Sequence, residues 1–148
     1  MTNSLNNYLE LDAITDTKQF VQKFLWQLCK DTEAGQGAFY IVNDNILNYI
    51  EGYAFPHSSD EDNNIEIGEG LTGQVAKDGK FINVTDVPEG YLTIISGLGK
   101  SSPTSLLIYP FKRNLQCVAV IEISGFKAFE QTTIEILEQL NDLVIKKI

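Results

Sequence analysis

Residues 68–140 of this chain, beginning GEGLTGQVAKDGKFINVTDVPEGY at 68–91, decide its fold. The stretch continues with GLGKSSP at residues 97–103, SLLIYPFKRNLQCVAVIEIS at 105–124 and FKAFEQTTIEILEQL at 126–140. The order of elements is a short helix opened by glycines, an Asp-Val-Pro turn, a polar loop, two apolar strands and a closing helix.

The composition fits one globular domain. The chain has 148 residues, of which 43% are hydrophobic, and a chain of this length buries about two-thirds of its unfolded surface in a single core. We treat residues 1–148 as one domain, with an N-terminal arm at 1–15 and a core at 16–148. Acidic residues outnumber basic ones by 20 to 11, which gives a net charge of −9. Nucleic acids and anionic membranes are bound through clustered Lys and Arg, so we expect contact with neither.

The sequence carries no recognisable targeting or metal-binding signal. It has no apolar run near the roughly 20 residues that span a bilayer, and its N-terminus lacks the basic and apolar regions of an export signal. We therefore expect a cytoplasmic protein. Cys29 and Cys117 occur without CxxC spacing or a His cluster, so we interpret both as small buried hydrophobic residues. We predict no metal and no cofactor.

The hydrophobic pattern predicts helices and hairpins in turn. Asp16 and Gln19 form a capping signature at the start of a helix, and the last hairpin is apolar enough to be covered on both faces. Predicted helices cover residues 16–33, 71–78 and 130–148, with an irregular helix at 89–96. Predicted strands cover residues 38–42, 46–54, 81–84, 104–111 and 115–124. Residues 1–14 are consistent with either an arm or a short helix.

The last predicted helix has two apolar seams. One seam consists of Ile134, Leu137, Val144 and Ile148, and the neighbouring seam of Ile136, Leu140 and Leu143. Together they are wider than one sheet-packing face usually needs. The second seam therefore indicates a twofold partner or a further segment of chain.

Residues 68–73 match the pattern GxGxxG, which occurs in dinucleotide-binding and kinase loops. A dinucleotide-binding fold needs a helix of ten or more residues after the glycines, whereas Asp78-Gly79 ends this helix within about two turns. The sequence also lacks the VAIK, HRD and DFG motifs of a kinase. We interpret these glycines as residues that supply tight backbone turns.

Glu122 interrupts a run of apolar residues in the last predicted strand. An unpaired carboxylate inside a covered sheet is costly, so Glu122 must face water, a partner or a polar cavity, and the sequence leaves these alternatives open. The single histidine, His57, lies in a predicted loop beside Pro56. No Ser-His-Asp or Cys-His arrangement is indicated around it, and we predict no catalytic residue.

This succession of elements resembles the GAF domain, a small sensory module of signalling proteins such as bacterial sensor histidine kinases. The resemblance covers residues 16–146 and is strongest over residues 69–129. It implies an α+β fold related to profilin-like and PAS folds, with a central antiparallel sheet, helices on one face and loops around a ligand pocket on the other. The ligand-binding residues that we predict on this basis are Asp86, Tyr91, Ser96, Gly97 and Thr104, with Glu122 as a further candidate.

The sequence departs from three known branches of that family. Cyclic-nucleotide-binding members have an Asn-Lys pair after the last strand, where this chain has Ser124-Gly125. Bilin-binding members attach their chromophore through a cysteine, and residues 86–104 contain none. The free methionine sulfoxide reductases use cysteines in the pocket loops, which Cys29 and Cys117 do not match. We therefore expect that the chain is not an enzyme.

The resemblance implies a sensory role. We expect a domain that binds a small molecule of unknown identity and relays the signal to an output domain or a partner signalling protein, with a homodimer formed through the terminal helices. Two alternatives are a GAF-like dimerisation module without a ligand and an enzyme of the free methionine sulfoxide reductase type.

Overall fold

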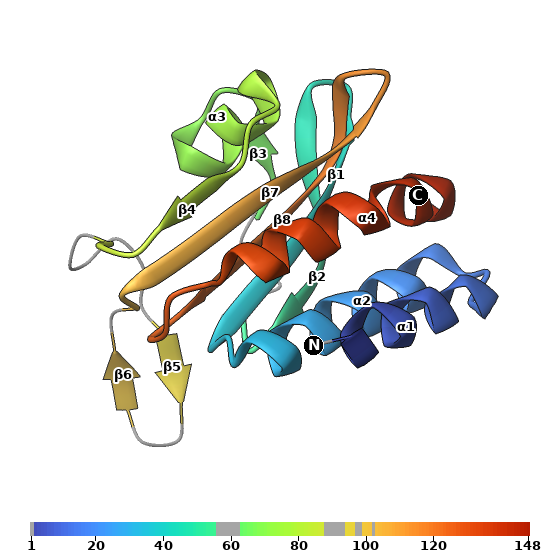
Figure 1. The fold of residues 1–148 in the computed structure, drawn as a ribbon. Helices are drawn as coiled ribbons and strands as arrows, with labels where there is room; N and C mark the ends of the chain where they lie inside the picture. The colour runs from blue at the N-terminus through green and yellow to red at the C-terminus, as the bar shows by residue number, and fades with distance from the viewer. Residues whose placement is uncertain (1, 56–62, 88–93, 97–98, 102) are drawn as a thin grey trace.

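The computed structural model describes residues 2–55, 63–87, 94–96, 99–101 and 103–148. Figure 1 shows a curved sheet with helices on both of its faces. In chain order the helices are α1 (Thr2–Leu9), η1 (Glu10–Ala13), α2 (Thr17–Thr32), α3 (Gly70–Asp78) and α4 (Gln131–Lys147). The strands are β1 (Gln36–Asn43), β2 (Ile46–Tyr53), β3 (Ile65–Glu66), β4 (Ile82–Val84), β5 (Ile94–Ser96), β6 (Gly99–Ser101), β7 (Ser105–Arg113) and β8 (Gln116–Gly125).

The main sheet has six strands in the order β3-β2-β1-β8-β7-β4, and every neighbouring pair is antiparallel. Strands β5 and β6 form a separate antiparallel ribbon. The two predicted hairpins, β1-β2 and β7-β8, are confirmed, and β1 pairs with β8 to join them into one sheet. The α+β class and the central antiparallel sheet are therefore as predicted.

The back face of the sheet, which carries Phe39 and Ile121, is covered by α2 and α4, and α1 packs against these two helices (Figure 1). Helix α2 begins where predicted, because the Asp16 side chain accepts a hydrogen bond from the Gln19 backbone N–H at 2.9 Å. Tyr8 of α1 is 1% exposed in the same core, so the N-terminal residues form a helix that belongs to it. The buried residues of α2 are Phe20, Val21, Phe24, Leu25, Leu28 and Cys29.

The front face of the sheet, which carries Ala38 and Val120, is covered by α3. Val75 and Ala76 of α3 belong, with Ile108 of β7, to a second and smaller core. Both faces of β7 and β8 are therefore buried, which explains their nearly continuous apolar sequence. The two cores lie on opposite sides of one layer of strands.

The prediction of an irregular helix over residues 89–96 is wrong for its last three residues. Ile94–Ser96 is strand β5, and its backbone pairs with Gly99–Ser101. The two consecutive β-branched residues Ile94 and Ile95 favour an extended backbone. Residues 89–93 lie outside the described part of the chain.

Both apolar seams of α4 are used within the chain itself. Ile134, Leu137 and Val144 are at most 1% exposed, and Leu140 and Leu143 of the second seam are also buried in the back core. The second seam contributes because α4 packs against α1 and α2 as well as against β7. The width of the apolar surface is thus explained without a second molecule, and the homodimer stays a prediction.

Candidate ligand site on the front of the sheet

Helix α3 is held against the front face by the glycines that precede and open it. Gly68 and Gly70 have φ of +93° and +62°, a backbone region that residues with a Cβ rarely adopt. A Cβ on Gly73 would lie 2.6 Å from the Glu66 carbonyl oxygen, and the Gly73 carbonyl accepts a hydrogen bond from the Gly68 N–H at 2.8 Å. The interpretation of the GxGxxG pattern as tight turns is confirmed. These turns bring the start of α3 close to β8.

A cluster of polar side chains lies on the front face of the sheet. Gln36 and Ala38 of β1 pair in register with Ser124 and Glu122 of β8, and side chains two residues apart on a strand point to the same face. Thr72 of α3, which is 5% exposed, donates a hydrogen bond from its hydroxyl to the Glu122 carboxylate. We call Gln36, Thr72, Glu122 and Ser124 the front polar cluster.

Glu122 is an acidic residue on the covered front face, and few of the described groups stabilise its negative charge. The residue as a whole is partly buried, and one of its carboxylate oxygens accepts the hydrogen bond from Thr72. Burial raises the pKa of Glu122 above its ordinary value, and the hydrogen bond from Thr72 opposes that rise only in part. Among the described residues, no basic side chain acts on the pKa of Glu122. Glu122 lines a small cavity on the front face, and its role among the alternatives that the sequence left open stays a prediction.

The cavity beside Glu122, which we call the front cavity, is small and contains an unpaired acceptor. It has a volume of about 10 Å³, which holds about one water-sized group. Gln36 is 4% exposed, and its side-chain oxygen Oε1 has no hydrogen-bond donor within the part of the chain that the structure describes. A buried acceptor of this kind is rare in folded proteins, since most have a partner. The residues that line the front cavity are Gln36, Gly37, Ala38, Phe55, Glu122 and Ser124.

Two of the sequence-predicted site residues lie at one end of the sheet, close to this cluster. The Val87 N–H donates to the Thr104 carbonyl oxygen at 3.2 Å, and the Thr104 N–H donates to the Gly125 carbonyl oxygen at 2.9 Å. These bonds place Asp86 and Thr104 beside the end of β8 that carries Ser124. Both residues are exposed. Neither residue lines the cavity beside Glu122, and their roles in ligand binding stay predictions.

Of the other three predicted site residues, one lies in the separate β5-β6 ribbon and two lie outside the described residues. Ser96 ends β5, in the ribbon that Figure 1 shows beyond the end of the main sheet where β7 begins. Tyr91 and Gly97 lie outside the described residues. The roles of these three residues in ligand binding stay predictions.

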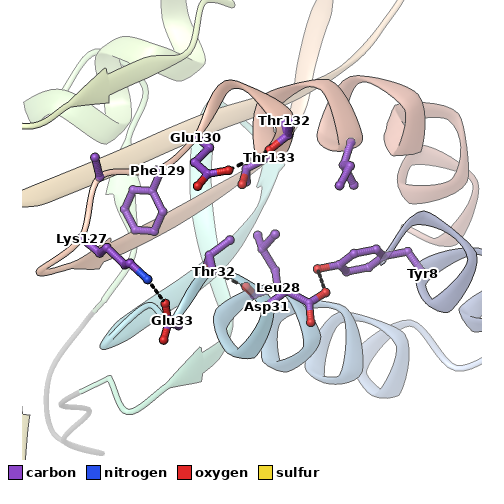
Figure 2. Close-up of a pocket in the computed structure, with 12 residues that line it drawn as sticks. Tyr8, Leu28, Asp31, Thr32, Glu33, Lys127, Phe129, Glu130, Thr132 and Thr133 are labelled. Atoms are coloured by element: carbon purple, nitrogen blue, oxygen red, sulfur yellow. Dashed lines mark hydrogen bonds and ion pairs between the residues drawn. The ribbon is translucent and has the colours of Figure 1, made fainter. Parts of the chain in front are cut away.

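A second hollow, which we call the back hollow, lies among the helices, and Figure 2 shows its lining. It has a volume of about 240 Å³ and is bounded by α1, α2, α4 and the segment that leads from β8 into α4. The Tyr8 hydroxyl in its wall donates to Asp31 at 2.9 Å, and Lys127 forms an ion pair with Glu33. A ligand would have to compete with these contacts. The front polar cluster is the stronger candidate because it contains a buried acceptor without a partner among the described residues.

The two cysteines are buried thiols. Cys29 lies in α2 and Cys117 in β8, and neither forms a disulfide. Burial raises the pKa of Cys29 to about 12 and that of Cys117 to about 11, so both are protonated at neutral pH. The prediction that they behave as small buried hydrophobic residues is confirmed.

The described ranges of the chain contain neither a metal cluster nor a membrane-spanning helix. No three or more His, Cys, Asp or Glu side chains within these ranges are grouped so that they could hold a metal ion. None of the helices described here combines the length and apolar character that crossing a membrane would require.

The comparisons with known proteins agree on the fold. The family model of the GAF domain matches residues 15–144. The GAF domain of a phosphoenolpyruvate-protein phosphotransferase from Coxiella burnetii superimposes with a TM-score of 0.83 at 17% identity, covering 99% of this chain and 91% of that one. The corresponding domain from Acinetobacter gives a TM-score of 0.81 at 12% identity, covering 99% and 90%. A search of curated proteins found no match.

Enzymes are also among the similar structures, and they correct one prediction. A free methionine-R-sulfoxide reductase from Neisseria meningitidis, solved in complex with its substrate, gives a TM-score of 0.73 at 19% identity, covering 95% of this chain and 82% of that one. The expectation that the chain is not an enzyme, which was drawn from its cysteine pattern, is wrong, because structures of enzymes are among those that share its fold.

Proposed function

This chain belongs to the GAF domain family, and we propose that it binds a small molecule on the front face of its sheet and relays that binding to a signalling partner or output domain, such as that of a sensor histidine kinase. The observation that carries the proposal is the front polar cluster. Among the described residues, the side chains of Gln36 and Glu122 receive one hydrogen bond between them, the one from Thr72. Buried polar groups of this kind cost stability, and such a cost is typical of a functional site.

Strand β8 connects the ligand face to the helices. Glu122 points to the front, while its neighbours Ile121 and Ile123 are fully buried in the back core. The same core contains Leu28 of α2 and Leu137 of α4. Tightly packed cores transmit small displacements, so a ligand that shifts β8 at Glu122 moves the surface on which these helices rest.

Hydrogen bonds join the C-terminal end of α4 to the residues before and at the start of α2. The Lys147 ammonium at the end of α4 donates to the carbonyl oxygens of Asp12 at 2.6 Å and Ile14 at 2.8 Å. The Thr17 hydroxyl at the start of α2 donates to the Lys147 carbonyl oxygen at 2.7 Å. A displacement of α4 therefore also moves the residues before α2. Relay requires that the ligand bind the two arrangements with different affinity.

Thermal unfolding in the presence of a metabolite panel tests the binding step. A ligand present at about 100 times its Kd stabilises a protein by about 2.7 kcal/mol. The matched variants are Ala38→Val, which fills space beside Glu122, and Ala128→Val, which lies at the back hollow. We expect the stabilisation to be lost in the first variant and kept in the second. A panel in which no compound raises the melting temperature would remove the support for sensing, and loss in Ala128→Val alone would move the site to the back.

Hydrogen exchange of α4 tests the relay step. We expect the ligand to change amide exchange at the C-terminal end of α4 in the wild-type protein. If exchange changes only in β1, β8 and α3, the ligand binds but its binding is not relayed to the helices.

A further inference from the structure

The ligand of the front cavity can be assigned to a chemical class from the hydrogen-bonding groups that line it. We infer that the site recognises a cationic N–H donor, such as a primary ammonium or an amidinium group, held between the Gln36 side-chain oxygen and the Glu122 carboxylate. The inference rests on the proposed function and names the kind of ligand that the same site takes.

The hydrogen-bonding capacity of the front polar cluster is the first support. Gln36 Oε1 is buried and lacks a donor among the described residues. A carboxylate has room for about four hydrogen bonds, and within the described part of the chain Glu122 receives one from a side chain, that of Thr72. The cluster therefore has spare acceptors. A ligand that offers only acceptors, such as a phosphate or an ionised carboxylate, would leave these groups unpaired.

Charge is the second support. Glu122 is an acid on a buried sheet face, and no basic side chain of the described ranges acts on its pKa. Burial penalises its ionised form. A cation beside the carboxylate would supply the missing opposite charge, and hydrogen bonds between charged groups are about twice as strong as neutral ones. A neutral donor such as an alcohol would satisfy Gln36 but not this charge.

The size and position of the front cavity are the third support. Gln36 and Glu122 line the same cavity of about 10 Å³, which accommodates one heavy atom with its hydrogens. Gln36 pairs with Ser124, and Ala38 pairs with Glu122, so the two acceptors lie on adjacent strands and point to the same side. Ala38 between them has a short side chain, which leaves the space open. A nitrogen placed in this cavity would therefore lie beside both acceptors.

Isothermal titration with three small probes of matched shape tests the inference. The probes are n-butylammonium chloride, n-butanol and sodium n-butyrate, each at the same ionic strength. The variants are Glu122→Gln, Gln36→Leu and, as a control, Glu135→Gln, which alters an exposed acid on α4. Circular dichroism checks that each variant is folded.

We expect n-butylammonium to bind the wild-type protein and the other two probes to bind more weakly. Glu122→Gln should lower the affinity for n-butylammonium by at least about tenfold, Gln36→Leu should also lower it, and Glu135→Gln should leave it unchanged. Equal binding of butanol or butyrate, or an affinity unaffected by Glu122→Gln, would overturn the inference. So would a failure of n-butylammonium to bind.

The metabolite panel separates this failure from a failure of the proposed function. If n-butylammonium does not bind, but an anionic or neutral metabolite stabilises the wild-type protein and not Ala38→Val, the front site stands and the ligand class is wrong. If neither the probes nor the panel bind, the proposed function fails as well.

Discussion

Replacing Glu122 by glutamine is expected to stabilise the ligand-free protein at neutral pH, although it removes the group that we assign to ligand binding. The Glu122 carboxylate accepts a hydrogen bond from Thr72, and among the described residues it has no basic neighbour that lowers its pKa. Glutamine has nearly the same shape and can still accept from Thr72, but it carries no charge to desolvate. Sites that bind ligands often cost stability when they are empty.

The pH dependence of this effect follows from the direction of the pKa shift of Glu122. Burial raises that pKa above the ordinary value of 4.5, so between this value and the folded pKa the folded protein holds a proton that the unfolded chain has released. Stability therefore falls as the pH rises through this window. A buried polar group with unmet partners costs about 1–3 kcal/mol. For a chain of this size each kcal/mol corresponds to about 2–4 °C in melting temperature.

Differential scanning calorimetry over a range of pH measures the effect directly. We expect Glu122→Gln to melt several degrees above the wild type at neutral pH, and we expect the difference to shrink as the pH falls towards 4.5 and to be lost below that value. Glu135→Gln, at an exposed position on α4, should change stability by less than about 0.5 kcal/mol at every pH. A Glu122→Gln protein that is less stable at neutral pH, or a difference independent of pH, would show that the carboxylate is well satisfied and refute the reasoning.

Three further substitutions test the rest of the structure. Phe24→Ala removes a fully buried ring that packs against four other aromatic rings and should cost about 3–5 kcal/mol in urea unfolding; a cost below about 1 kcal/mol would contradict the back core. Gly73→Ala places a Cβ 2.6 Å from the Glu66 carbonyl oxygen and should destabilise by about 1–2 kcal/mol, since overpacking outweighs the helix propensity gained; a higher melting temperature would be incompatible with that contact. Leu115→Gly relieves a residue that is 89% exposed at φ +68° and should stabilise by about 0.5–1 kcal/mol, which a thermal melt detects; an unchanged or lower melting temperature would argue against strain in this turn.

The sequence was sufficient for those elements whose signals are local. The capping signature at Asp16 and the spacing of Phe20, Phe24 and Leu28 specify both the start and the buried face of α2. The glycines before α3 predict turns because a positive φ is nearly restricted to glycine. The strands of both hairpins were predicted for a similar reason, since their β-branched and aromatic residues favour extended backbone.

Features that depend on contacts between distant residues were not predictable in the same way. The direction of the Glu122 side chain follows from the pairing of β8 with β1 and β7, which no local pattern reveals. Tyr8 was missed because its surroundings in the sequence are polar, although it completes the back core. The second seam of α4 suggested a partner because the sequence does not show that α1 and α2 pack against α4. These contacts join residues far apart in the chain.

Three members of the front polar cluster, Gln36, Thr72 and Ser124, were not predicted as site residues from the sequence. Gln36 precedes an apolar strand and reads as a solvated residue at its edge, and Thr72 lies within a glycine pattern that is explained by backbone turns. A signal was present for Gln36, because it has the same alternation as Ala38 and Tyr40 and so points to the same face. This alternation could be used to place Gln36 beside Glu122 only once the pairing of β1 with β8 was known.

The assignment of a cationic ligand to the front face is tested most directly by NMR. Backbone amide shifts of the labelled protein are followed while n-butylammonium chloride is added. We predict saturable changes at Gln36, Thr72 and Glu122, with little change at Asp31 and Lys127 of the back hollow. Changes confined to the residues around Asp31 and Lys127, or no saturable change at Glu122, would contradict the account.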